Sequence, residues 1–267
     1  MTESHGVIVC ASRHLPRHEW PRAASNAMKV NSGNRPPGLE EDDVPSGSEG
    51  ERLALDVTRY WGTQGVHLTV GFFDTPDPAL RARILLHLNA WSLTANVRFV
   101  ESNVEPQVRI ARCTAREAAP GEDGYWSNLG TDILLIRPDR PTMNLEAFTM
   151  KIPDSEFNRV VRHEAGHTLG FPHEHMRKAI IERLDREKVI REYMRTQGWT
   201  RQEVIDQVLT PLEESSLLGT PAAEADSIMC YEIAANLTLD GKAIVGGSDI
   251  TPSDSAFAAQ VYPEPPR

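Results

Sequence analysis

The sequence has few cysteines, no long apolar run and no excess of positive charge. Its 267 residues include three cysteines, an odd and widely spaced set that cannot supply the disulfide framework of a small secreted domain. No apolar run approaches the ~20 residues that a membrane-spanning helix needs. The apolar stretch at residues 7–11 is too short for the core of a signal peptide. We therefore expect a cytoplasmic protein by default, and release by a non-classical route stays open as an alternative.

The charge balance narrows the classes of partner. Acidic residues outnumber basic ones by 38 to 28, which gives a net charge of −10. This excess argues against a nucleic acid or an anionic membrane as partner. A hydrophobic content of 40% is ordinary for a globular protein, and the chain is long enough to bury a substantial core. The number of copies in an assembly is left open.

The pattern H-E-x-x-H-x-x-G-x-x-H occupies residues 163–173. His163 and His167 are four residues apart, so a helix would place both imidazoles on one face, within reach of one metal ion. Gly170 lets the helix end in a turn, because glycine accepts positive φ, and that turn can bring His173 to the same ion. Three neutral imidazoles with an open fourth position are typical of a catalytic zinc site. The pattern therefore predicts one zinc ion, with Glu164 placed to act on water as a general base.

The first 50 residues differ in composition from the rest. They are rich in proline, glycine, serine and asparagine, so we expect a poorly ordered leader. The alternative is an inhibitory pro-segment, in which Cys10 could ligate the zinc. We expect residues 51–267 to form a catalytic domain, with an N-terminal subdomain at about 51–173 and a C-terminal subdomain at about 174–267.

Local patterns predict strands, then the metal helix, then mainly helices. Strands are expected at 68–73, 97–100, 108–111 and 133–136, and helices at 78–91, 181–195, 200–209 and from 251 to just before Pro263. Asp77 should cap the first helix, and Asp154 or Ser155 the metal helix. The buried stripe of that metal helix should comprise Phe157, Val160, Val161, Ala165 and Leu169.

Three segments share their pattern with a known family. They are H-E-x-x-H-x-x-G-F-x-H-E-x-x-R at 163–177, S-x-M-x-Y at 227–231 and the segment W-S-N-L-G at 126–130. In these segments the chain resembles the astacin family of the metzincin zinc metalloproteases, over roughly residues 66–262. The second segment corresponds to the Met-turn of that family, and the third to the edge strand before the metal helix.

The resemblance implies an α+β, metzincin-like fold. A twisted, mostly parallel sheet and the active-site helix would form the N-terminal subdomain, and the C-terminal subdomain would be mainly helical. Met229 would lie beneath the zinc, and Tyr231 would reach the oxyanion in catalysis or the metal as an additional ligand. In secreted relatives the residue corresponding to Glu174 pairs with the trimmed N-terminus.

The chain departs from the family at two cysteine-related positions. Cys230 stands where the Met-turn usually has histidine, and Tyr125 where the edge strand usually follows a disulfide-bonded cysteine. We interpret Cys113 and Cys230 as small apolar core residues. We expect His175, which has no assigned role, to be exposed.

The resulting hypothesis is a zinc-dependent metalloendopeptidase. It would hydrolyse peptide bonds of a polypeptide substrate through a zinc-bound water, with Glu164 as general base. The substrate would pair in extended form with the edge strand at 126–130. The alternative is a zinc-bearing peptide-binding module or a latent protease that does not cut.

Overall fold

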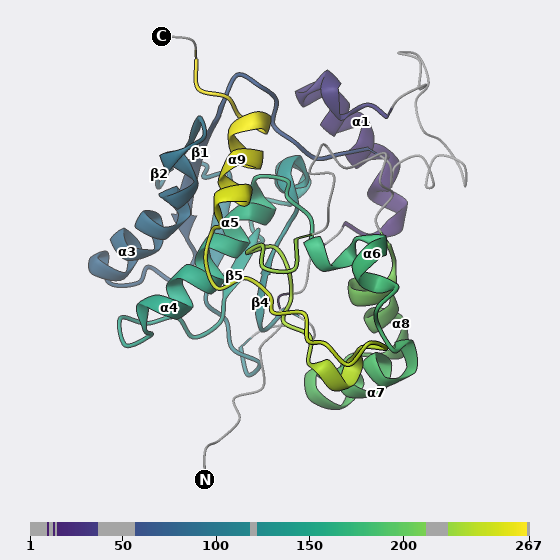
Figure 1. Cartoon of the computed structure of the whole chain (residues 1–267). Coiled ribbons are helices and arrows are strands. Elements are labelled where there is room, and N and C mark those ends of the chain that lie inside the picture. Colours follow the sequence, from purple (N-terminus) through teal and green to yellow (C-terminus); the bar gives the residue numbers. More distant parts are fainter. Residues whose placement is uncertain are drawn as a thin grey trace.

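The computed structural model describes Cys10, Arg13 and residues 15–36, 57–117, 122–211 and 224–265. Its centre is a five-stranded sheet of order β2-β1-β3-β5-β4 (Figure 1). The strands are β1 (Val66–Phe72), β2 (Val97–Glu101), β3 (Val108–Ala111), β4 (Tyr125–Ser127) and β5 (Met143–Leu145). All pairings are parallel except that of β4 with β5, so the prediction of a mostly parallel sheet is confirmed.

Helix α3 (Pro78–Leu88) follows β1 and packs against the sheet (Figure 1). Its first turn forms as predicted, because the Asp77 side chain accepts a hydrogen bond from the Ala79 N–H at 2.8 Å. Leu80, Ile84 and Leu88 lie one turn apart and are all buried.

The helix that carries the metal motif has three parts. α4 (Asp154–Glu156) leads into a π-helical turn, η5 (Phe157–Val161), and then into α5 (Arg162–Thr168). The predicted stripe is buried in full: Phe157, Val160, Val161, Ala165 and Leu169. The expected side-chain cap is wrong, because Pro153 is the N-cap residue and no side chain caps the helix.

Residues 133–136 do not form the predicted strand. Residues 133–135 belong to a 3₁₀ helix, η4 (Gly130–Leu135), which turns at Gly130 with φ of 45°, and Ile136 is its C-cap residue. Only part of this apolar run is buried, because Leu134 is exposed while Ile133 lies in the core. A short apolar run fits a strand or a helical turn equally well, and β5 takes the place in the sheet beside β3.

The second half of the chain is mainly helical, as predicted. Its elements are η6 (Glu174–Met176), α6 (Lys178–Ile181), α7 (Arg186–Gln197), α8 (Arg201–Val204), the π-helical η7 (Ile205–Leu209), η9 (Ala235–Leu237) and α9 (Pro252–Val261). α6, α7 and α8 lie together beside the sheet half (Figure 1). α9 returns to the sheet half, where Ala258, Val261 and Tyr262 join its core. Within the described part of the chain, none of the helices is both long and apolar enough to cross a membrane.

The leader contains a packed helix where we expected poor order. α1 (Trp20–Val30) buries Ala23, Ala24 and Ala27. Asn34, also buried, donates hydrogen bonds from Nδ2 to the carbonyls of Ala27 (2.9 Å) and Tyr60 (2.8 Å). For residues 15–36 the expectation of poor order is therefore wrong. The helix buries little apolar surface, but its small alanine side chains let it pack closely against the rest of the chain.

Candidate metal centre

Three imidazoles converge at the end of α5. The Nε2 atom of His173 lies 3.2 Å from that of His163 and 2.9 Å from that of His167. The chain reaches His173 through a turn at Gly170, whose φ of +94° favours glycine. A Cβ atom there would lie 3.0 Å from the carbonyl oxygen of Arg59, so space as well as conformation excludes a side chain. The three predicted histidines are thus brought together by one helix and one glycine turn.

Backbone carbonyls fix the orientation of two of these rings. Nδ1 of His163 lies 2.6 Å from the Ile228 carbonyl oxygen, and Nδ1 of His167 lies 2.8 Å from that of Phe171. A carbonyl only accepts, so each Nδ1 carries the hydrogen and each Nε2 lone pair points toward the common centre. Burial lowers the pKa of His163 to about 4, which keeps the ring neutral at physiological pH.

A cysteine from the leader completes the cluster. Sγ of Cys10 and one ring nitrogen each of His163, His167 and His173 all lie within 4.8 Å of one another, and all four residues are buried. Burial, with the Glu164 carboxylate next, raises the pKa of the Cys10 thiol well above its ordinary value. Three imidazoles and one thiol are the donor types and the number that a four-coordinate zinc takes, so these residues fit the metal.

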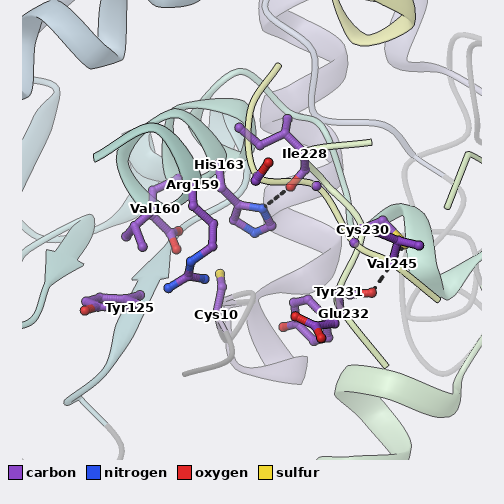
Figure 2. A pocket seen from close by; sticks show the side chains of 14 residues that line it. Cys10, Tyr125, Arg159, Val160, His163, Ile228, Cys230, Tyr231, Glu232 and Val245 are labelled. Atoms are coloured by element: carbon purple, nitrogen blue, oxygen red, sulfur yellow. Dashed lines mark hydrogen bonds between the residues drawn. The ribbon is translucent and has the colours of Figure 1, made fainter. Parts of the chain in front are cut away.

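Glu164 lies beside this cluster in a cavity of about 200 Å³. Figure 2 shows Cys10 between Arg159 on one side and Tyr231 on the other. Glu164 is fully buried; neither carboxylate oxygen makes a hydrogen bond of good geometry with the described residues, but the Cys10 thiol lies close enough to interact with the carboxylate. Burial raises its pKa to about 8, although Cys10 and Arg159 act in the opposite direction. A carboxyl group of this kind is placed to exchange protons near neutral pH.

Tyr231 lines the same cavity with a buried hydroxyl that has no partner among the described residues. Its ring stacks on His175 with 3.9 Å between centroids and 20° between planes, and it lies 4.4 Å from the ring of His173. His175 is therefore buried, and the expectation that it is exposed is wrong. Its Nε2 donates to the Gln207 carbonyl at 3.1 Å, a contact that spacing along the sequence does not reveal.

The predicted Met-turn lies against α5. A Cβ atom on Gly166 would lie only 2.5 Å from Sδ of Met229, so the glycine lets the methionine approach the helix. Asp254 of α9 holds this turn by accepting hydrogen bonds from the Ser227 hydroxyl (2.6 Å) and the Ile228 N–H (3.0 Å). The helix predicted from residue 251 contains Asp254, but helical spacing does not reveal this second role.

The other residues singled out from the sequence lie around this centre. Glu174 forms an ion pair with Arg177 at 2.7 Å and accepts a hydrogen bond from the Glu224 N–H at 3.2 Å. Burial raises the pKa of Glu174 above its ordinary value. Cys230 is buried as interpreted, whereas Cys113 is only half-buried, and both are free thiols.

The leader also pairs with the edge of the sheet. The Arg13 N–H donates to the Ser127 carbonyl, and Nδ2 of Asn128 donates to the Arg13 carbonyl, both at 3.3 Å. Arg13 and Asn128 thereby form a parallel bridge. Arg13 thus pairs with the edge strand predicted to bind an extended polypeptide.

The fold is similar to that of known proteins. One solved structure of myroilysin matches this chain with a TM-score of 0.70 and 29% sequence identity, and the match covers 78% of this chain and 97% of that chain. A second structure of myroilysin matches with a TM-score of 0.57 and 28% identity, and covers 88% of this chain and 97% of that chain. High choriolytic enzyme 1, a hatching enzyme zinc-protease from Oryzias latipes (medaka fish), shares the fold with a TM-score of 0.50 at 17% identity, over 75% and 92%. No protein-family model and no curated protein sequence matches the chain.

Proposed function

We propose that this chain, an astacin-like zinc metalloprotease of the metzincin group, cuts internal peptide bonds with Glu164 as general base and is kept latent by Cys10. It is a hydrolase that acts on polypeptides, and it holds a single catalytic zinc. The observation that carries the proposal is the buried Glu164 carboxyl, which has the Cys10 thiol as a close polar neighbour and lies beside three converging imidazoles. A binding module would have no use for such a group, since burying it costs free energy.

In this proposal His163, His167 and His173 hold the zinc, as their shared centre and fixed tautomers support. Bound there, zinc supplies a Lewis acid that polarises the scissile carbonyl and acidifies the attacking water. Glu164 accepts the proton of that water and returns it to the leaving amine. The Tyr231 hydroxyl donates a hydrogen bond to the oxygen that becomes negative in the transition state.

Latency is the second part of the proposal. The Cys10 thiol occupies the position that a water or a substrate carbonyl needs, and Arg13 occupies the edge strand. A cysteine that joins three histidine ligands takes the fourth coordination position, which a catalytic zinc site needs open. The full-length chain is then an inactive form until Cys10 and Arg13 leave these positions.

Cleavage of a panel of denatured proteins tests both parts. The zinc-loaded full-length chain is compared with Cys10→Ala and with the matched control Cys113→Ala, each with and without a chelator. We expect fragments from Cys10→Ala at a rate at least tenfold above the other two proteins, and none with chelator. Equal rates in all three proteins would remove the latency proposal.

The same panel separates a protease from a peptide-binding module. If Cys10→Ala holds zinc and binds the denatured proteins but yields no fragment, the enzyme proposal is wrong. Elemental analysis of His167→Ala tests the ligands independently of activity, because two imidazoles and a thiol hold zinc less tightly than four donors. Full zinc content in that variant after dialysis against a chelator would contradict the assignment.

A further inference from the structure

The outer edge of β4 carries a second group of side chains that the proposed chemistry does not use. Successive residues of a strand point to opposite faces, so Trp126 and Asn128 share one face and Ser127 takes the other. Ser127 faces the metal helix, where its hydroxyl lies 3.0 Å from that of Thr168. The face with Trp126 is the one that the leader covers.

An arginine of the leader lies on this face. Cζ of Arg13 is 3.7 Å from the centroid of the Trp126 ring, and an Nη1 atom lies 3.9 Å from a carboxylate oxygen of Glu122. With the leader in place, Trp126 is only 2% exposed. A guanidinium over an indole ring beside a carboxylate combines cation–π and ionic attraction.

The groups that receive Arg13 are held by contacts outside the leader. The Trp126 Nε1–H donates to the Glu122 carbonyl at 2.9 Å, which fixes the plane of the indole ring. Arg140 also contacts the Glu122 carboxylate, and burial together with the Arg140 charge lowers the pKa of Arg13, whereas the nearby Asp123 carboxylate acts in the opposite direction. The indole face and the carboxylate therefore stay in place when the leader departs.

We propose that Trp126 and Glu122 form a subsite for a basic side chain, arginine before lysine, in the polypeptide substrate. The inference rests on the proposed proteolytic function and adds a substrate preference to it. The leader provides the template, because its backbone hydrogen bonds with Ser127 and Asn128 are those that an extended substrate would make. A chain that pairs with the edge strand in either direction places alternate side chains on the Trp126 face.

The leader also indicates how far the basic residue lies from the bond that is cut. Arg13 follows Cys10 by three residues, and Cys10 lies in the proposed metal site. At ~3.3 Å per residue, a substrate bound in extended form spans about 10 Å over three residues. The subsite therefore receives a residue two or three positions from the scissile bond.

The test uses quenched fluorescent peptides that differ at one position. Each carries a single arginine, lysine, alanine or glutamate two or three residues to one side of one cleavable bond. The enzyme is the zinc-loaded full-length chain with Cys10→Ala and Arg13→Ala, which removes the side-chain contacts that Cys10 and Arg13 make with the metal centre and the Trp126 face. We expect kcat/KM for one arginine peptide to exceed that of its alanine counterpart by about threefold to thirtyfold, the range of a cation–π contact.

Two further substitutions show whether Trp126 and Glu122 cause that preference. Trp126→Leu keeps apolar bulk but removes the aromatic face, and Glu122→Gln keeps shape but removes charge. Each should bring the arginine-to-alanine ratio toward one, whatever its effect on the absolute rates. Both peptides are measured with the same enzyme preparation, so a smaller folded fraction lowers both rates equally and leaves their ratio unchanged. If Trp126→Leu fails to fold, Glu122→Gln decides.

The possible failures can be told apart. Cleavage of all peptides at equal rates would overturn the basic subsite and leave the proteolytic function standing. An unchanged ratio in both variants would also overturn it. No cleavage of any peptide by the zinc-loaded enzyme would instead remove the proposed function, and the subsite with it.

Discussion

The backbone of Ile228 connects Asp254 with His163. Its N–H donates to the Asp254 carboxylate at 3.0 Å, and its carbonyl lies 2.6 Å from Nδ1 of His163. A carboxylate in the last helix of the chain thereby orients an imidazole of the metal site through a single peptide residue. Such supporting hydrogen bonds typically affect metal affinity about tenfold to a hundredfold.

We expect Asp254→Asn to weaken zinc binding by about tenfold to a hundredfold. The amide can accept only on one side, so the Ser227 hydroxyl or the Ile228 N–H loses its partner. Competition with a chelator of known affinity measures the effect. Asp249→Asn is the control, because Asp249 pairs with Arg162 at 2.6 Å at a partly exposed site. Equal zinc affinities in the two variants would contradict the supporting role of Asp254.

Glu164→Gln should retain zinc and lose hydrolysis by about a hundredfold to ten-thousandfold, the usual worth of general acid–base catalysis. Because neither carboxylate oxygen makes a hydrogen bond of good geometry, and the Cys10 thiol is absent from the Cys10→Ala background, the substitution should not lower the Tm in that background. The Glu164→Gln variant and its parent both carry Cys10→Ala, so that the cleft is open when their rates are compared. Cleavage at more than a tenth of the parent rate would place the base elsewhere.

Gly170→Ala should destabilise the chain more than Gly198→Ala. Both glycines have positive φ, +94° and +69°, which costs roughly 1–3 kcal/mol for another residue. At Gly198 nothing lies within 4 Å of a Cβ atom, whereas at Gly170 the Arg59 carbonyl oxygen is 3.0 Å away. Urea unfolding should therefore give a lower free energy of unfolding for Gly170→Ala than for Gly198→Ala. Only Gly170→Ala should also lower the zinc affinity, because its turn carries His173. A reversed order would contradict this account of the turn.

Locally determined features were predictable from the sequence. The buried stripe of the metal helix follows from helical spacing, and the capping boxes at Thr200 and Thr251 form within four residues each. The histidine cluster was predictable because one helix and one turn suffice to assemble it. In these cases the interacting groups are neighbours along the chain.

Features that depend on distant partners were not predictable. The α1 helix packs against η4 and Val57, which lie far along the chain, and His175 is buried because Tyr231 and Gln207 cover it. Cys10 was identified only as one alternative, since more than 150 positions separate it from the histidines. The strand predicted at 133–136 is a helical turn instead, because four consecutive apolar residues show neither the alternation of a strand nor the 3.6-residue spacing of a helix.

Tyr231→Phe should lower kcat by about a hundredfold to a thousandfold, as expected for loss of one hydrogen bond to an oxyanion. KM should change little, because the contact forms mainly in the transition state. In the full-length chain the hydroxyl is buried without a described partner, so its removal should leave the Tm unchanged or raise it. The ring still stacks on His175 in the phenylalanine variant, which keeps the packing of the site.

Steady-state kinetics in the Cys10→Ala background, beside a thermal melt and zinc analysis, tests this expectation. Tyr193→Phe is the matched control, because Tyr193 is buried in the same apolar cluster but does not line the cavity. Its kcat should stay within about twofold of the parent, since no transition-state contact is lost. A fall in zinc content in Tyr231→Phe alone would make the phenol a metal ligand instead of an oxyanion donor. If kcat, KM and zinc content are all unchanged, Tyr231 takes no part in catalysis.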